Sequence, residues 1–127
     1  MRWAKEDGMQ RVLVVDDQVD FRQAFSALLE AQPDLKVAGS VGSLAEARTM
    51  LEGVDVVIFD RSLPDGDGVE LIGPLREANP GARVLAMSAT AEMGHPEEAI
   101  RAGADGVIDK LDPFERAFAL IRGEEGG

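Results

Sequence analysis

The segment "VVIFDRSLPDGDG", Val56 to Gly68, joins four consecutive apolar residues to an aspartate, Asp60, and then to a loop rich in glycine and carboxylates. A continuous apolar run, in contrast to an alternation of apolar and polar residues, is typical of a strand covered on both faces, as in a parallel sheet. A buried strand that stops at a charged group delivers that group to an edge of the sheet. We therefore expect Asp60 to serve a function at that edge.

The same kind of run recurs along the chain and alternates with helical patterns. The runs in "RVLVVDD", "ARVLAMSA" and "DGVIDK" predict three further strands, and the more alternating "LKVAGSV" predicts an edge strand. Between the runs, apolar residues such as Phe21, Phe25 and Leu29 follow helical spacing, and Ser43 with Glu46 forms a capping box. This order predicts an α/β fold, a doubly wound, five-stranded parallel sheet with five helices on its two faces.

Glycine and proline residues set the expected helix boundaries. Gly53 is expected to close the second helix and Gly103 the fourth, as C-terminal caps. The third helical segment contains Gly73 and Pro74, and a proline in a helix interior costs about 3 kcal/mol. This helix therefore either starts late, with Pro74 in its first turn, or is kinked, and we expect the late start.

Length and composition restrict the class of protein. A chain of 127 residues is expected to form one domain, here residues 11–122, after a loose leader of residues 1–10 and before a tail or linker start at 123–127. The net charge of −11 would repel a phosphate backbone, so we expect no direct nucleic-acid binding. No apolar run is long enough to span a membrane, and cysteine is absent. We expect a soluble intracellular protein.

Polar side chains end four of the predicted strands: Asp16 and Asp17 the first, Asp60 the third, Ser88 the fourth and Lys110 the fifth. The carboxyl ends of parallel strands share one edge of the sheet, where ligands bind, so these groups should meet. Two carboxylates about 5 Å apart repel by roughly 3 kcal/mol at an effective dielectric constant near 20, so positive charge must lie among them.

A lysine and a divalent cation would supply that positive charge. Lys110 provides one part, and Mg²⁺ suits a site that has few carboxylates and keeps several waters. We expect its ligands to be the Asp17 and Asp60 carboxylates and the backbone carbonyl of Ser62, with Asp16 acting through water. Such a site is equipped for phosphoryl transfer, with the central Asp60 as the nucleophile.

The motifs "VLVVDD", "FDRSLPDGDG", "MSA" and "GADGVIDK", in this order and spacing, resemble the receiver domain of bacterial two-component response regulators. The resemblance covers residues 11–122 and implies a flavodoxin-like sheet with the strand order 2-1-3-4-5. It is closest to the NarL/LuxR-type branch. Full-length members of that branch usually carry a C-terminal helix-turn-helix domain, which we expect this chain to be without.

The resemblance also implies a role for each polar residue. Asp60 accepts a phosphoryl group from the phosphohistidine of a sensor histidine kinase. Asp16, Asp17 and Asp60 hold Mg²⁺, and Ser88 and Lys110 contact the phosphoryl oxygens. The domain is then a switch that phosphorylates and dephosphorylates itself, and it is not a turnover enzyme on external substrates.

The partners implied by the resemblance are the kinase and a downstream effector or a second copy of the domain. The switching surface is expected near the fourth helix, the fifth strand and the fifth helix. The resemblance is to cytoplasmic regulators of transcription, so we expect a cytoplasmic location and no membrane contact.

Two alternatives remain open. Relatives commonly carry an aromatic residue where this chain has Val107, and this departure supports a pseudo-receiver that binds partners without phosphorylation. The other alternative is a Mg²⁺-dependent phosphatase with an aspartyl intermediate. Such an enzyme would want a second acid soon after the nucleophile, but Arg61 and Ser62 follow Asp60. A phosphorylatable switch is the leading hypothesis, because all the acidic, hydroxyl and lysine positions are present.

Overall fold

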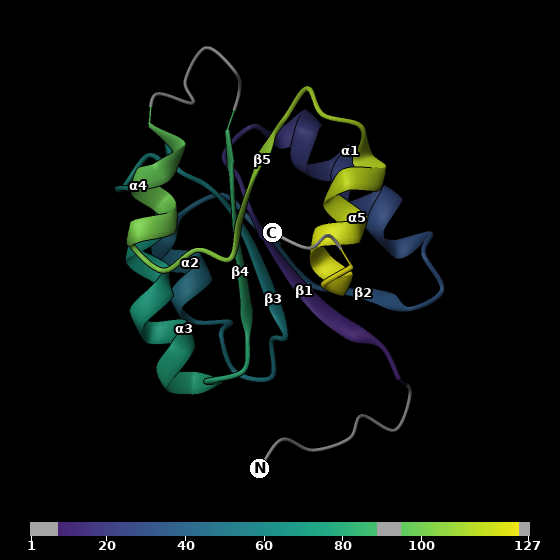
Figure 1. Ribbon diagram of the computed structural model, residues 1–127, viewed down its shortest axis with the longest axis horizontal. Helices are drawn as coiled ribbons and strands as arrows, with labels where there is room; N and C mark the ends of the chain where they lie inside the picture. Colours follow the sequence, from purple (N-terminus) through teal and green to yellow (C-terminus); the bar gives the residue numbers. More distant parts are fainter. Residues whose placement is uncertain (1–7, 89–94, 125–127) are drawn as a thin grey trace.

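The computed structural model describes residues 8–88 and 95–124. They form one parallel sheet of five strands in the order β2-β1-β3-β4-β5, flanked by helices (Figure 1). The elements in chain order are β1 (Gln10–Val15), α1 (Val19–Glu30), β2 (Leu35–Val41), α2 (Leu44–Arg48), β3 (Val56–Asp60), the 3₁₀ helix η1 (Gly68–Leu71), α3 (Ile72–Ala78), β4 (Arg83–Ser88), α4 (Pro96–Arg101), β5 (Gly106–Asp109) and α5 (Phe114–Arg122). The predicted alternation of five strands with five α-helices and the strand order implied by the resemblance are confirmed.

The N-terminal leader and the C-terminal tail lie largely outside the described residues. The leader was predicted to extend to residue 10, but β1 already begins at Gln10, whose N–H donates to the carbonyl of Asp34. Residues 1–7 and 125–127 are not described.

The central strands are the ones with continuous apolar runs. Every residue of β3 is buried, and Ile58 in its middle pairs with Val14 of β1 and Leu85 of β4. β2 lies at one edge and, as its alternating sequence predicts, exposes alternate residues. β5 lies at the other edge, and only its Ile108 is buried, although its run resembles those of the central strands. The burial of a strand therefore follows the number of its neighbours as well as its sequence.

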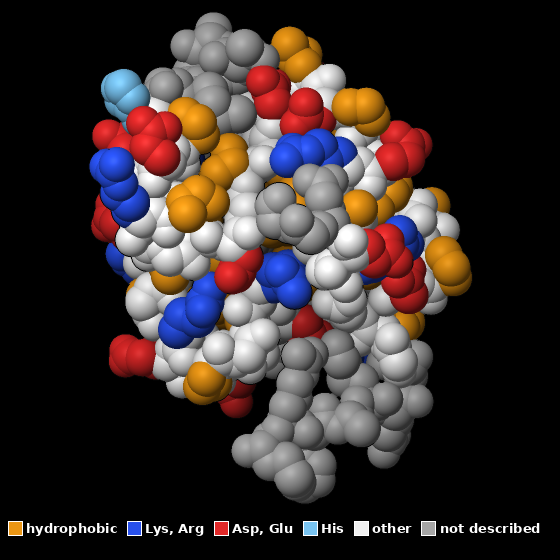
Figure 2. Space-filling model, in the orientation of Figure 1, with side chains coloured by type: hydrophobic (Ala, Val, Ile, Leu, Met, Phe, Trp, Pro, Cys, Tyr) orange, Lys and Arg blue, Asp and Glu red, His pale blue; other side chains and the backbone are white. Residues whose placement is uncertain are grey.

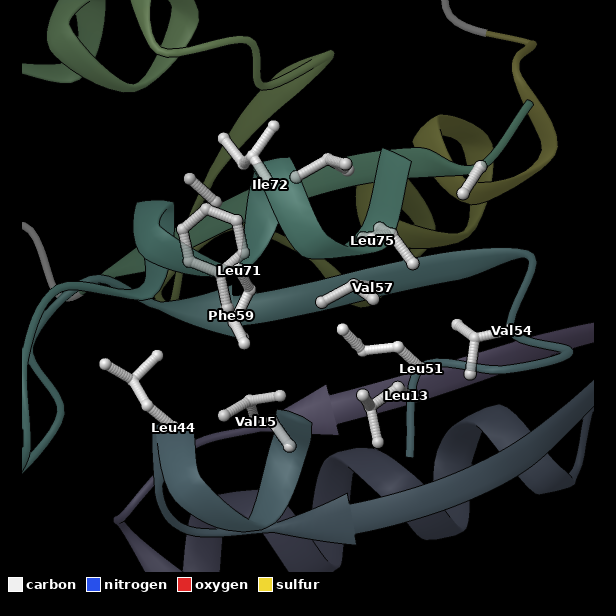
Figure 3. Close-up of a cluster of buried hydrophobic side chains, with 14 of the residues drawn as sticks. Leu13, Val15, Leu44, Leu51, Val54, Val57, Phe59, Leu71, Ile72 and Leu75 are labelled. Carbon is white, nitrogen blue, oxygen red and sulfur yellow. The ribbon is translucent and has the colours of Figure 1, made fainter. Parts of the chain in front are cut away.

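Two hydrophobic clusters, one on each face, hold the helices to the sheet. α1 and α5 cover one face, and α2, α3 and α4 cover the other (Figure 1). Because successive side chains of a strand point to opposite faces, Val14 joins the α1/α5 cluster and Val15 joins the opposite one. Figure 3 shows the latter, with side chains of α2 and of the η1–α3 segment packed on β1 and β3. No helix within residues 8–88 and 95–124 is both long and apolar enough to cross a membrane.

The third helical segment starts late, as Pro74 requires. Pro74 is the third residue of α3, where its missing N–H removes no helical hydrogen bond. The 3₁₀ turn η1 precedes it directly and is capped by Asp67, whose side chain accepts from the Val69 N–H, while Glu70 reaches back to the Asp67 N–H. The predicted late start of α3 is confirmed, and its first turn continues from a separately capped 3₁₀ turn.

Helix α2 is shorter than its sequence indicates. Ser43 caps its start by accepting from the Glu46 N–H at 3.2 Å, as predicted. The helix ends at Arg48, after which Met50 N–H donates three residues back, to the Ala47 carbonyl. Gly53 has a φ of +78° but lies in a later turn, so the prediction that it closes α2 was wrong. The predicted cap of α4 at Gly103 is confirmed by its φ of +114° and its bond to the Ile100 carbonyl.

The loop after β3 uses its two glycines for different reasons. Gly66 has a φ of +146° and closes a tight turn with Leu63, in which each N–H donates to the other's carbonyl. Gly68 is needed for space, because a Cβ there would lie 2.6 Å from the Asp60 carbonyl oxygen and would collide with the Phe59 ring. This loop is therefore packed tightly against the end of the strand that carries Asp60.

Candidate functional site

The predicted site residues lie along the carboxyl edge of the sheet. Asp16 follows the last residue of β1, Asp60 ends β3 and Ser88 ends β4. Lys110 follows β5, and its backbone N–H donates to the Ser88 carbonyl at 3.0 Å. Asp60 pairs with Met87, the residue before Ser88. The parallel topology thus brings groups from four strands to one edge, as predicted.

Asp16, Asp17 and Asp60 form an acidic cluster at this edge. Each of the three offers a carboxylate oxygen that lies within 4.8 Å of the oxygens of the other two. Asp16 and Asp60 are almost fully buried, whereas Asp17 is exposed. One oxygen of each buried carboxylate is fixed by the backbone two residues on: Asp16 Oδ1 accepts from the Gln18 N–H, and Asp60 Oδ1 from the Ser62 N–H, both at 2.8 Å.

Lys110 bridges the two buried carboxylates. Its Nζ lies 2.7 Å from Asp16 Oδ2 and 2.9 Å from Asp60 Oδ2, and it donates a hydrogen bond to Gln18 Oε1 at 2.6 Å. Only 6% of the Lys110 side chain is exposed. The same Nζ lies 4.7 Å from the centre of the Phe21 ring, above its face. The ammonium is therefore enclosed by three oxygens and one aromatic face.

Burial and charge act in opposite directions on the pKa values of this site. Burial lowers the pKa of Lys110, but hydrogen bonds and attraction from Asp16 and Asp60 outweigh it and raise the pKa above its usual value. Burial raises the pKa of Asp16, and the neighbouring Lys110 and the Gln18 N–H offset this only in part. Lys110 is thus held as a cation. For Asp16, burial disfavours the ionised form of the carboxyl group.

The acidic cluster fits a hard divalent cation. Asp16 Oδ2 is buried, and its partner among the described residues is the Lys110 ammonium at 2.7 Å. Three carboxylates beside one ammonium leave an excess of negative charge when all are ionised, and oxygen ligands of this kind suit Mg²⁺. Ser62 is at the site through its N–H, and its carbonyl oxygen stays a predicted ligand.

Ser88 and Val107 lie on the neighbouring parallel strands β4 and β5. Ser88 is 2% exposed, ends β4 and pairs with Asp109. Val107 pairs with Ala86 and packs, half-buried, against the hydrophobic cluster under α2, α3 and α4. The contact between Ser88 and a phosphoryl oxygen stays a prediction, as does the consequence of lacking an aromatic side chain at Val107.

Sequence reasoning missed several contacts around the site. Gln18 and Phe21 both contact Lys110, and the Arg22 side chain donates to the Asp16 carbonyl at 2.7 Å. Phe21 had been identified only as an apolar helix residue, since spacing along α1 does not show which loop residue its ring faces. Nothing in the sequence distinguishes Gln18 from an ordinary polar residue at a helix start.

Arg61 connects the segment after Asp60 to the start of α4. Its guanidinium donates to the Asp67 and Glu98 carboxylates at 3.0 and 3.3 Å and to the His95 carbonyl at 3.2 Å. Its side chain is 20% exposed. These contacts join the loop after β3 to α4, two segments that are far apart in the sequence.

Comparisons with known proteins find relatives that match most of the chain. The family described as the response regulator receiver domain matches residues 12–122. The DNA-binding transcriptional activator DevR/DosR of Mycobacterium tuberculosis is 38% identical over 115 residues, which are 88% of this chain and 53% of that protein. The transcriptional regulatory protein UhpA of Salmonella typhimurium is 36% identical over 122 residues, which are 94% of this chain and 61% of that protein. The chain thus spans little more than half the length of these relatives.

A solved structure leads to the same assignment. The beryllofluoride-activated NtrC4 receiver domain dimer is 29% identical to this chain, with a TM-score of 0.77, and the match covers 91% of this chain and 96% of that one. The family match extends over nearly the whole described chain, and the acidic cluster and lysine lie at the carboxyl edge of the family's fold. This chain belongs to the response regulator receiver domain family of two-component systems.

Proposed function

We propose that this domain accepts a phosphoryl group on Asp60 from the phosphohistidine of a sensor histidine kinase, in the presence of Mg²⁺. The observation that carries the proposal is the contact of the Lys110 ammonium with two buried carboxylates, Asp16 and Asp60, inside an acidic cluster. A cation held beside Asp60 lowers the cost of bringing a phosphoryl dianion to that carboxylate.

The proposed reaction needs few groups. One carboxylate oxygen of Asp60 attacks phosphorus, a P–O bond forms, and the P–N bond of the phosphohistidine breaks with its electron pair returning to the imidazole nitrogen. Lys110 neutralises charge on the transferred oxygens, and the Ser88 hydroxyl donates to one of them. The Ser62 N–H keeps one Asp60 oxygen oriented, because it already donates to Oδ1.

Asp16, Asp17, Asp60 and the Ser62 carbonyl would hold Mg²⁺ in this proposal. When bound, the ion neutralises the remaining negative charge of the cluster and of the phosphoryl oxygens. The domain then releases the phosphoryl group to water by its own chemistry, and it does not turn over external substrates.

Phosphorylation would act as a switch because of its charge. A phosphoryl group forms charge-assisted hydrogen bonds worth about 1.5–3 kcal/mol each. Reversing a two-state equilibrium from 1:99 to 99:1 needs about 5.5 kcal/mol, so two or three such bonds suffice. Lys110 and Ser88 are the proposed donors.

The proposed output surface is the face of α4, β5 and α5. Figure 2 shows this side of the molecule, where apolar side chains lie over α4 among acidic and basic ones. Ile100 of α4 is 49% exposed, and it is an apolar side chain that a partner would cover. The related NtrC4 receiver domain is a dimer in its beryllofluoride-activated form, and this supports a second copy as one candidate partner.

The relatives of this domain suggest the process in which it takes part. DevR/DosR and UhpA are transcriptional regulators, so we propose a role in transcription, in the cytoplasm, through a partner or segment other than residues 11–122. The charge of −11 disfavours direct contact of this chain with DNA.

Intact mass spectrometry tests the phosphoryl acceptor. The purified protein is incubated with acetyl phosphate and Mg²⁺, and we expect one added phosphoryl group that is absent in Asp60→Asn. No adduct on folded wild-type protein would refute the proposal and favour a pseudo-receiver. An adduct that persists in Asp60→Asn would place the acceptor elsewhere, and rapid turnover of unrelated phosphate esters would favour a phosphatase.

Calorimetric titration with Mg²⁺ tests the metal site. Asp17 is exposed, so Asp17→Asn should leave the fold intact and weaken Mg²⁺ binding. Asp20→Asn, which removes an exposed carboxylate of α1, is the matched control and should bind Mg²⁺ like the wild type. If both variants weakened Mg²⁺ binding equally, the loss would come from the change in net charge, and Asp17 would not be a ligand. Chelation of Mg²⁺ should also abolish the phosphoryl adduct.

A further inference from the structure

The environment of Lys110 depends on the first turn of α1. Besides Asp16 and Asp60, the ammonium contacts Gln18, the residue before α1, and Phe21, the third residue of α1. The lysine side chain is flexible, with four methylene groups, and the two carboxylates draw its end toward the acidic cluster. The ring face of Phe21 adds an aromatic contact to the oxygen contacts of Nζ.

Phe21 is itself held by other aromatic rings. It stacks on Phe25, with ring centres 5.8 Å apart, and Phe25 stacks on Phe114 of α5 at 5.6 Å. Phe21 and Phe114 lie 6.4 Å apart. These rings line a small pocket together with Lys110. A ring fixed in this way offers a defined surface to the ammonium, since Phe25 is buried and its neighbours span two helices.

We propose that Phe21 is a positioning residue for Lys110: its ring face holds the ammonium between Asp16 and Asp60, in the place from which it meets the incoming phosphoryl group. An ammonium over an aromatic face is attracted by the ring quadrupole, and more strongly where water is excluded, as around this nearly buried side chain. The expected effect of Phe21 on phosphoryl uptake rests on the proposed function. Its effect on the position of the Lys110 ammonium is independent of that function.

The inference makes Phe21 different from the other rings of the cluster. Phe21→Leu keeps an apolar side chain and removes the ring face. Phe118→Leu removes a ring of α5 from the same hydrophobic cluster, but the described contacts include no ring contact of Phe118 with Phe21 and no approach to the Lys110 ammonium, so it is the matched control. Phe21→Tyr keeps a ring face and is the rescue variant.

The first measurement is the NMR resonance of the Lys110 ammonium in the protein without Mg²⁺ or phosphoryl donor. Burial slows the exchange of its protons, and the only other lysines of the chain, Lys5 and Lys36, can be replaced to assign it. Protons over a ring face are shielded, so Phe21→Leu should move the resonance downfield, while Phe118→Leu and Phe21→Tyr should leave it near the wild-type position. A resonance that is unchanged in Phe21→Leu would overturn the inference.

The second measurement is the rate of phosphoryl uptake from acetyl phosphate at saturating Mg²⁺, on variants shown to be folded by circular dichroism. Phe21→Leu should slow uptake by about three- to thirtyfold relative to Phe118→Leu, the range that corresponds to one cation–π contact. Phe21→Tyr should restore it. A difference below twofold between the two leucine variants would overturn the positioning role. If the wild type takes up no phosphoryl group, the proposed function fails, and the NMR shift still decides whether Phe21 holds the ammonium.

Discussion

Replacing Lys110 by methionine removes the charge that the two buried carboxylates share and keeps a side chain of similar length. Asp16 and Asp60 are 0% and 2% exposed, and Lys110 is their cationic neighbour in the structure. Without it, both carboxylates keep the cost of burial and lose the positive charge that offsets part of it, while their backbone N–H bonds remain. The variant is therefore expected to be substantially less stable when Mg²⁺ is absent.

The magnitude follows from the burial of the pair. Removing one partner of a buried ion pair costs about 3–5 kcal/mol, because the other charge is left uncompensated. A domain of this size has a free energy of unfolding of about 5–15 kcal/mol, so the loss is a large fraction of the total. With an m value of about 2 kcal/mol/M in urea, the midpoint should fall by roughly 2 M.

Mg²⁺ should restore part of this stability, since it brings positive charge to the same carboxylates. A ligand at a hundred times its dissociation constant stabilises the folded state by about 2.7 kcal/mol. The stability of Lys110→Met should therefore depend on Mg²⁺, and chelation should remove the gain.

Urea unfolding followed by circular dichroism, with and without Mg²⁺, measures both effects. Lys36→Met is the matched control, because Lys36 is exposed on the edge strand β2, and its replacement should change the free energy of unfolding by less than about 0.5 kcal/mol. A loss below about 1 kcal/mol for Lys110→Met in the absence of Mg²⁺ would refute the reasoning. It would mean that the carboxylates are hydrated or protonated in the folded state.

Two further predictions concern the loop after β3 and the α1–α5 side of the molecule. Gly68→Ala places a Cβ 2.6 Å from the Asp60 carbonyl oxygen and against the Phe59 ring, so it should lower the free energy of unfolding by about 1–3 kcal/mol; a urea midpoint equal to that of the wild type would contradict the close packing. The Arg122 guanidinium donates two hydrogen bonds of 2.8 Å to the Asp34 carboxylate and lowers the pKa of Asp34 below its usual 3.8. The pair therefore stabilises the folded state fully above pH 3.8, and this contribution is lost as the pH falls through the lowered pKa. Because the Asp34 side chain is 42% exposed, Asp34→Asn should cost at most about 1 kcal/mol at pH 7 in urea unfolding, and the difference from the wild type should shrink in acid; a constant difference would rule out the ion pair as its source.

Local patterns predicted much of the fold because they report local physics. The buried run of β3 and the alternation of β2 reflect how many faces of a strand are covered, and the cost of a proline inside a helix favoured a first-turn position for Pro74. The pattern was less informative where burial depends on neighbours. The run of β5 resembles those of the central strands, but its place at the edge leaves most of it partly exposed.

The sequence by itself determined the element order, and with it the edge at which Asp16, Asp60 and Lys110 meet, because parallel strands that alternate with helices place all their carboxyl ends together. Only the tertiary structure decided what surrounds the ammonium. That Lys110 lies between two carboxylates, beside Gln18 and over the Phe21 ring, depends on how α1 packs against the loop after β5. Side-chain spacing along one helix carries no information about a loop that follows 89 residues later, since such contacts are set by packing across the sheet.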